Sequence, residues 1–402
     1  MVRLLNVLRS GAWLTRPRLV AYSRLLLAAY AILILVGLLT ATGPMDALRR
    51  PLGTDFSQVW AAGVAVLAGH PEQPFDPALH AAAQRALFAP DTPFYGWHYP
   101  PYFLAIAALL ALLPYIPALL IWQGTTFAVY LLVVRRILPH PLTLLVAAAF
   151  PAVLVNVGHG HNGFLTASLL GGGLLLLDRR PVLAGVLLGL LVYKPQFGLV
   201  LPLALLAGRR WTAIASAAGT VVLMTLATLA AFGAEPWRAF RSSLAFTRTV
   251  VLEEGNTGWE KIQSAFSAAR ALGAGVSTAY AMQGVLTGAV VLALAWLWYG
   301  RADMRLKSAA LIAATLLSTP YVLDYDMVVL GPALAFAVSW ELARGVRPWM
   351  ASLLAAVWVA PLLTRTVAGI TLIPLGLIVM VAFFAATIRS AFPVSSRYAI
   401  RT

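Results

Sequence analysis

The residues most able to do chemistry in this sequence are ionisable side chains within or beside long apolar runs. Inside a membrane such side chains cost several kcal/mol, which makes them candidates for a functional role. Lys194 stands directly before Pro195 in an otherwise apolar stretch, so a charge and a backbone break coincide. Breaks of this kind bind anions or substrates in membrane proteins. The other candidates are three carboxylates, two imidazoles and an amide: Asp55, Asp324, Asp326, His159, His161 and Asn162.

Each candidate also has a purely structural interpretation. Asp55 and Asp324 could each cap the N-terminus of a helix that follows. Lys194 could extend to the membrane surface without any further task. His159 and His161 lie two apart among glycines, which suggests a metal ion. A metal site usually offers more ligands at helical spacing, however, so we predict no metal.

The composition of the chain indicates that these residues belong to a membrane protein. Of 402 residues, 61% are hydrophobic and only 11% are charged, and the mean hydropathy is +0.84. Soluble domains have roughly 45–50% apolar and about 25% charged residues. The absence of cysteine excludes disulfides, thiolate metal sites and thiol nucleophiles. We therefore expect an all-α polytopic membrane protein whose residues 1–402 form a single integral membrane domain.

Apolar runs of roughly 20 residues can cross the hydrocarbon core. The stretch 181–207 is interrupted at Tyr193–Gln196 and predicts two short half-spans that meet there. The stretch 101–114 is shorter and is predicted to be interfacial or re-entrant. The total is about 12 spans. The continuous runs lie near 19–41, 116–134, 142–157, 162–177, 211–232, 279–299, 306–320, 325–341, 349–363 and 371–388.

The connections between spans differ strongly in charge. With a cytoplasmic N-terminus, the segments predicted to lie inside hold 18 Lys or Arg and two acidic residues. The segments predicted to lie outside, with Asp324 and Asp326 included, hold 9 Lys or Arg and 11 acidic residues. This asymmetry is the positive-inside pattern of membrane proteins. It explains the net charge of +15 without a nucleic-acid partner. The first 41 residues carry four arginines before a run of full spanning length, which predicts a signal anchor with both chain termini cytoplasmic.

This orientation brings the candidate residues of four separate segments to the outside face. The two longest connections, 42–100 and 233–278, lie on the same side, and long loops in a bundle usually have a function. Apolar residues from Phe56 to Leu67, with Trp60 among them, follow helical spacing and predict an amphipathic helix at the interface. A second such helix is expected over 77–88. The first loop ends in an aromatic cluster that an interfacial belt would also explain: Trp97, His98 and Tyr99.

These segments, taken in order, resemble glycosyltransferase family 87, membrane enzymes of the GT-C architecture that include polyprenyl-phosphate-mannose-dependent α-1,2-mannosyltransferases. The resemblance extends over roughly 50–345. Phe75, where the family more often has Tyr, and His161, where Gln is common, depart from the pattern. The matching motifs are Asp55-Phe56, Ala62-Gly63 with Gly69, Pro74-Phe75-Asp76-Pro77, Tyr99-Pro100-Pro101, Gly160-His161-Asn162, Lys194-Pro195-Gln196, Thr319-Pro320-Tyr321 and Tyr325-Asp326.

The resemblance implies a GT-C bundle that transfers a sugar, mannose or another hexose, from a polyprenyl phosphate to a glycolipid or glycan with inversion. Asp55 would then be the general base on the acceptor hydroxyl. Lys194 would balance the phosphate charge together with the segment His159, His161 and Asn162. Residues expected to contact substrate are Trp60, Trp97, His98, Tyr99, Asp324 and Asp326.

Other classes of membrane protein remain open at this stage. Broken helices with charges are also typical of secondary transporters and lipid or polysaccharide flippases. No internal repeat is visible, and the charges collect at one face rather than at the midplane, which favours an enzyme. An assembly protein would need no such cluster. The enzyme needs no cofactor or metal, because a lysine can balance a departing lipid phosphate. The composition suits a bacterial inner membrane.

Overall fold

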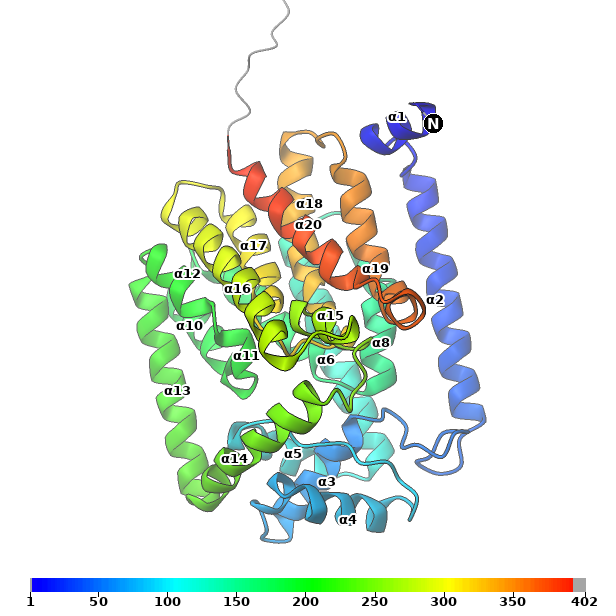
Figure 1. Cartoon of the computed structure of the whole chain (residues 1–402), viewed down its shortest axis with the longest axis vertical. Helices are drawn as coiled ribbons and strands as arrows, with labels where there is room; N and C mark the ends of the chain where they lie inside the picture. Colours follow the sequence, from blue (N-terminus) through cyan, green and yellow to red (C-terminus); the bar gives the residue numbers. More distant parts are fainter. Residues whose placement is uncertain (1, 393–402) are drawn as a thin grey trace, which may run out of the picture.

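The computed structural model describes residues 2–392, of which most are helical and none forms a β-strand (Figure 1). The prediction of an all-α protein is confirmed. Six helical segments are long and apolar enough to cross a membrane. They are α2 (Arg16–Leu39), α6 (Tyr115–Ile137), α13 (Trp211–Phe232), α16 (Val276–Tyr299), η5 (Asp324–Val329) continuing into α18 (Leu330–Arg344), and α19 (Met350–Thr371). The chain is thus a membrane protein, and the total of about 12 spans stays a prediction.

Shorter apolar helices complete the bundle. The stretch 181–207 is divided where the sequence predicted a break, since Lys194 has non-helical backbone angles and Pro195 removes a donor. The helices are α9 (Gly163–Leu176), α10 (Pro181–Gly189), η3 (Leu190–Tyr193), α11 (Pro195–Gly198), α12 (Leu201–Ala207), α17 (Met304–Leu317) and α20 (Leu375–Ser390). The run near 142–157 is likewise two helices, α7 (Thr143–Ala148) and α8 (Pro151–His159), with Pro151 at the first position of the second.

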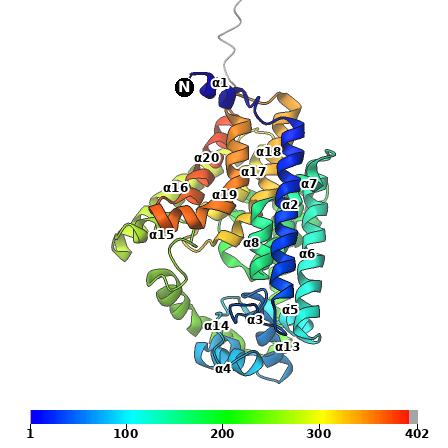
Figure 2. The same ribbon diagram turned by 90° about the vertical axis from the view of Figure 1, so that its right-hand side faces the viewer.

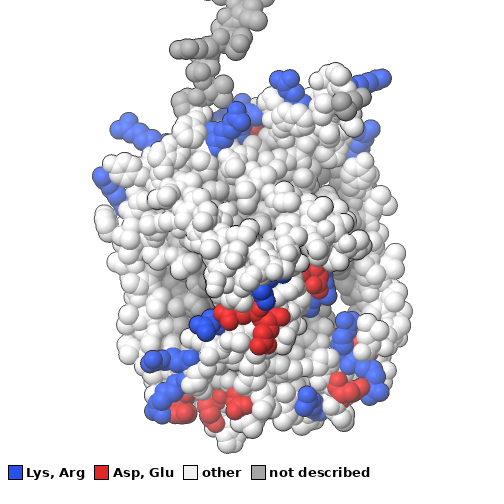
Figure 3. Space-filling model, in the orientation of Figure 1, with Lys and Arg blue, Asp and Glu red and all other residues white. Residues whose placement is uncertain are grey.

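The two ends of the bundle carry different structures. α1 (Val2–Ser10) lies at one end, and the first long loop forms the opposite end together with α14 (Glu235–Phe246) (Figures 1 and 2). Basic side chains gather at the α1 end with few acidic ones, whereas both signs are mixed at the other end (Figure 3). The helices of the loop-bearing end are α3 (Phe56–Leu67), η1 (Gln73–Phe75), α4 (Pro77–Leu87), η2 (Pro101–Phe103) and α5 (Leu104–Ala111).

The buried core runs through α17, whose residues are almost all inaccessible, and through most of α18. α2, by contrast, stands at the edge of the bundle with few buried residues, as expected of a helix surrounded by lipid. α3 packs very closely on α5, because a Cβ at Gly63 would lie 2.0 Å from the Ala107 carbonyl oxygen. This close approach fixes α3, and with it the residue that precedes α3, Asp55.

The second long loop folds back over the ends of the core helices. It contains the π-helical segment η4 (Thr247–Glu253) and α15 (Ala265–Ala271). Its backbone pairs with the segment before η5: Gln263 N donates to Val322 O at 2.7 Å, and Asp324 N donates to Lys261 O at 2.9 Å. Backbone hydrogen bonds thereby hold residues 261–263 against residues 322–324, about 60 positions later in the chain.

Candidate active site

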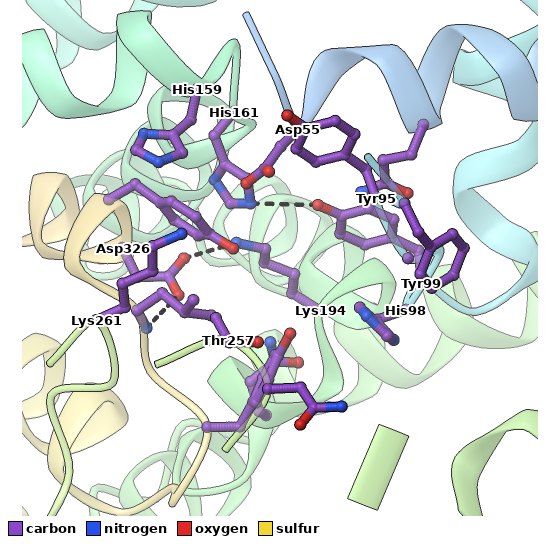
Figure 4. A pocket seen from close by; sticks show the side chains of 18 residues that line it. Asp55, Tyr95, His98, Tyr99, His159, His161, Lys194, Thr257, Lys261 and Asp326 are labelled. Atoms are coloured by element: carbon purple, nitrogen blue, oxygen red, sulfur yellow. Dashed lines mark hydrogen bonds and ion pairs between the residues drawn. The ribbon is translucent and has the colours of Figure 1, made fainter. Parts of the chain in front are cut away.

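A cavity of about 230 Å³ lies where the loop-bearing end meets the helix ends (Figure 4). A single water needs only about 10–15 Å³ of such space. The wall is shared by both long loops, the turn after α8, the break after η3 and the start of η5. The residues that line it are Asp55, Gln58, Phe94, Tyr95, Gly96, His98, Tyr99, His159, His161, Lys194, Gln196, Asn256, Thr257, Lys261, Tyr321, Leu323, Tyr325 and Asp326.

Asp55 stands at the N-cap position of α3 but does not cap it. Its backbone is in the helical region, and its side chain accepts no hydrogen bond from the first turn. Asp76, at the N-cap of α4, shows the usual arrangement, because its carboxylate accepts from Ala78 N at 2.8 Å and Leu79 N at 3.0 Å. Within residues 2–392 the Asp55 carboxylate has neither a hydrogen-bond donor nor a cation within 4.0 Å.

The surroundings of Asp55 favour its protonated form more than water would. Burial raises the pKa of Asp55 above its ordinary value, while the positive charges of His159, Lys261 and Lys194 act to lower it. A carboxylate with a raised pKa is a stronger base than a free one. A free carboxylate at a cavity wall is a candidate for accepting a proton from a bound group.

Lys194 forms an ion pair with Asp326 at the inner end of the cavity. Its Nζ lies 2.7 Å from Asp326 Oδ1, and the two side chains are 4% and 2% exposed. The second oxygen, Asp326 Oδ2, accepts from Leu323 N at 3.1 Å. The break after η3 provides the space for the lysine, and the irregular start of η5 presents the carboxylate. The two charges balance each other in a dry environment.

The turn between α8 and α9 presents His159 and His161 to the same cavity. His161 stacks on Tyr325 with 3.8 Å between ring centroids, and its Nε2 lies 3.2 Å from the Tyr99 hydroxyl. His161 Nδ1 is buried and has no partner among the described residues. His159 Nδ1 lies 2.9 Å from Val155 O in its own helix. Each imidazole thus keeps one ring nitrogen for another partner.

The aromatic end of the first loop contacts the second loop. His98 Nδ1 lies 2.9 Å from Thr247 Oγ1 at the start of η4. Burial lowers the pKa of His98 to about 4, so this imidazole is neutral at physiological pH. Phe94 and Phe246 meet beside it, with 6.3 Å between ring centroids. These contacts close the cavity on the side of the loops.

Four of the predicted site residues do not line the cavity. Trp60 donates to Leu113 O at 3.0 Å and packs on Phe88 and Tyr115. Trp97 is 3% exposed, within the core. Asn162 is buried beside the turn, and Asp324 accepts from Tyr325 N at 2.9 Å. The predicted residues that the structure brings to the cavity are Asp55, His98, Tyr99, His159, His161, Lys194 and Asp326.

Sequence reasoning missed several polar residues of this wall. Gln58 is one helical turn after Asp55 and could have been found from that spacing. Lys261 is one of several charged residues in the second loop, and nothing in its local sequence distinguishes it. The other polar residues of this group are Tyr95, Gln196, Asn256, Thr257 and Tyr321.

Comparison with protein families gives a match to glycosyltransferase family 87 over residues 97–323. The chain belongs to family 87. The matched range contains both histidines, Lys194 and Lys261, whereas Asp55 precedes it and Asp326 follows it. Neither the curated proteins nor the solved structures gave a match. Membership of family 87 indicates that this membrane protein is a glycosyltransferase.

Proposed function

We propose that this family 87 protein transfers a sugar from a polyprenyl-phosphate donor to a hydroxyl of a glycolipid or glycan, with inversion at the anomeric carbon. The sugar is a hexose, and mannose is the first to test. Family membership supports glycosyl transfer. The donor class follows from the resemblance to polyprenyl-phosphate-dependent enzymes and from a cavity that combines one free carboxylate with lysines and imidazoles.

The observation that carries this proposal is the uncommitted carboxylate of Asp55 at the cavity. It neither caps α3 nor pairs with a cation, although both arrangements would stabilise the protein. A half-buried carboxylate without a partner costs free energy, and such costs concentrate at functional sites. Asp55 is the general base in our proposal.

The reaction follows from these positions. Asp55 accepts the proton of the acceptor hydroxyl, and the oxygen attacks the anomeric carbon from the face opposite the phosphate. The bond from that carbon to the phosphate oxygen breaks, and the lipid phosphate leaves with one additional negative charge. Lys194 and the unpaired nitrogens of His159 and His161 are available near the departing group. Asn162, buried behind them, supports the turn, and no metal or cofactor takes part.

We propose that the cavity opens to the extracytoplasmic side of a bacterial inner membrane, with both termini cytoplasmic. The concentration of basic residues at the α1 end supports this orientation (Figure 3). The donor and the acceptor lipid would then approach the loop-bearing end from the outer leaflet. Asp324 at the edge of the cavity, and Trp60 and Trp97 behind its wall, would support substrate contacts made by Tyr99 and His98.

The test is sugar transfer by the purified protein in liposomes that contain radiolabelled polyprenyl-phosphate mannose and a membrane glycolipid extract. Asp55→Asn is expected to reduce transfer by about 10²- to 10⁴-fold, the usual contribution of a general base. Asp91→Asn is the matched control, because Asp91 lies in the same loop, is exposed and pairs only with Arg49. Full transfer by Asp55→Asn would remove Asp55 from the role of base.

The same assay addresses the alternative of a secondary transporter or flippase. A labelled lipid that crosses the bilayer without a new glycosidic bond would support the alternative. A product with the anomeric configuration opposite to that of the donor supports inversion, and a product with the same configuration would contradict it.

A further inference from the structure

The two lysines of the cavity differ in how their charges are balanced. Lys194 is held by Asp326 at 2.7 Å, and both side chains are almost completely inaccessible. A phosphate that approached this pair would be attracted by the ammonium and repelled by the carboxylate. The pair therefore offers hydrogen bonds to a ligand but little net charge.

Lys261 has no such partner. No carboxylate oxygen of residues 2–392 lies within 4.0 Å of its Nζ, and Figure 4 shows its side chain extending into the cavity. The adjacent acid, Glu260, does not neutralise it, because the Glu260 carboxylate lies against the backbone of Gly258. Lys261 thus brings to the wall a positive charge that forms no ion pair with a described residue, and Asp55 and Asp324 interact with it only at longer range.

The backbone around Lys261 is fixed on both sides. The Lys261 carbonyl accepts from Asp324 N at 2.9 Å, and the bridge between Ile262 and Leu323 continues the contact. Trp259 lies under the guanidinium of Arg270, 5.3 Å from ring centroid to Cζ. A lysine at the tip of an unattached loop would have to be ordered by its ligand, whereas this one is positioned beforehand.

Two small polar residues stand beside Lys261 on the same wall. Asn256 and Thr257 line the cavity between Gly255 and Gly258, which have φ values of +71° and +92°. Residues with a side chain rarely adopt these backbone conformations, so the two glycines permit the tight turn that brings Asn256 and Thr257 to the cavity. An ammonium, an amide and a hydroxyl together supply donors for an anionic group with several oxygens.

We infer that Lys261, with Asn256 and Thr257, binds the phosphate of a prenyl-phosphate ligand. The inference rests on the proposed function and adds three residues of the second long loop to its phosphate site. In the transfer step the bond between sugar carbon and phosphate oxygen breaks, so the phosphate changes from a diester monoanion to a monoester dianion. Lys261 stabilises that additional charge, and Lys194, whose own charge is balanced by Asp326, adds a hydrogen-bond donor.

The experiment measures binding without any transfer reaction. Full-length protein in lipid nanodiscs is titrated with farnesyl phosphate in a calorimeter. Lys261→Gln is expected to weaken binding by about 10- to 100-fold, the usual effect of losing a charge-assisted hydrogen bond. Lys261→Arg keeps the charge and should stay within about tenfold of the natural protein. Arg241→Gln, an exposed cation of the same loop outside this cavity, should bind within about twofold.

The outcomes separate the possible failures. Unchanged binding by Lys261→Gln would overturn the assignment of Lys261 and leave the proposed function standing. No binding of farnesyl phosphate by the natural protein would overturn the proposed donor class as well. Inorganic phosphate tests the source of the anion: if it binds as tightly as farnesyl phosphate and also depends on Lys261, the site is for free phosphate rather than for a lipid. An equal loss with Arg241→Gln would indicate general surface attraction and would overturn the site.

Discussion

Two sets of residues that line the cavity use the same residue types in opposite ways; we call Lys194, Asp326, His161 and Tyr99 the inner wall, and Asp55, Lys261 and His159 the outer wall. On the inner wall the side chains form two pairs, Lys194 with Asp326 and His161 with Tyr99. On the outer wall, Asp55 and Lys261 have no side-chain partner within the described chain, and His159 bonds only within its own helix. A paired group has fewer free donors or acceptors for a substrate, whereas an unpaired polar group inside a protein lowers its stability. We therefore expect loss of one partner of an inner-wall pair to reduce mainly stability, and loss of an outer-wall group to reduce mainly activity.

The largest effect is expected from breaking the inner wall. Asp326→Asn leaves the ammonium of Lys194 buried without its counter-charge, and the loss of one partner of a buried pair destabilises a protein by about 3–5 kcal/mol. Unfolding of the detergent-solubilised protein by denaturant, followed by tryptophan fluorescence, measures this loss.

Replacing both partners provides the control for that measurement. Lys194→Met combined with Asp326→Leu should recover most of the stability, because no buried charge remains. Asp91→Asn, which breaks an exposed pair, should cost about 1 kcal/mol or less. If Asp326→Asn were as mild as Asp91→Asn, the inner wall would not be the structural side of the cavity.

Much of this arrangement could be predicted from the sequence, because its signals are local. Apolar runs predicted the helices, and Pro195 after Lys194 predicted the break. Loop charges predicted which segments share an end, and that end contains the cavity. These features depend on hydropathy and on proline geometry, which operate over a single turn or span.

The pairing of groups could not be predicted. Lys194 and Asp326 are 132 residues apart, and the position of Lys261 depends on backbone bonds to a distant segment. An aspartate before a helix is compatible with a cap or with a free base, and only the side-chain contacts distinguish Asp55 from Asp76. The same limit applies to Trp60. Its aromatic side chain is compatible with a substrate contact, but in the structure the indole packs against other rings.

A smaller effect is expected from removing a contact between the first loop and the second loop, which carries Lys261 of the outer wall. Thr247→Val keeps the shape of the side chain but removes its hydrogen bond to His98, which should lower the local opening free energy of the second loop by about 0.5–1.5 kcal/mol. Amide hydrogen exchange of residues 247–261 measures this opening. Thr249→Val is the matched control, because the Thr249 side chain has no hydrogen bond to a described residue. Equal exchange in the two variants would show that the loops are joined by other contacts.

The smallest change in stability distinguishes two of the four aspartates of the first loop, Asp55 and Asp76. Asp76→Ala should lower the free energy of unfolding by about 1 kcal/mol, because it removes a helix cap. Asp55→Ala should cause no loss of stability at pH 7.5 and a slight gain, since this carboxylate caps nothing and its surroundings disfavour its charged form. Denaturant unfolding measures both variants, and transfer activity should be lost only with Asp55→Ala.

The pH dependence gives the sign of the Asp55 effect. The pKa of Asp55 in the folded protein is raised above its ordinary value of 3.8, so the unfolded chain loses this proton at a lower pH than the folded protein does. Between the pKa of the unfolded chain and that of the folded protein, the stability of the natural protein therefore falls as pH rises. The advantage of Asp55→Ala should therefore be present at pH 7.5 and disappear toward pH 4. A loss equal to that of Asp76→Ala at pH 7.5 would mean that Asp55 is a structural cap. The outer wall would then lack the free base on which the comparison depends.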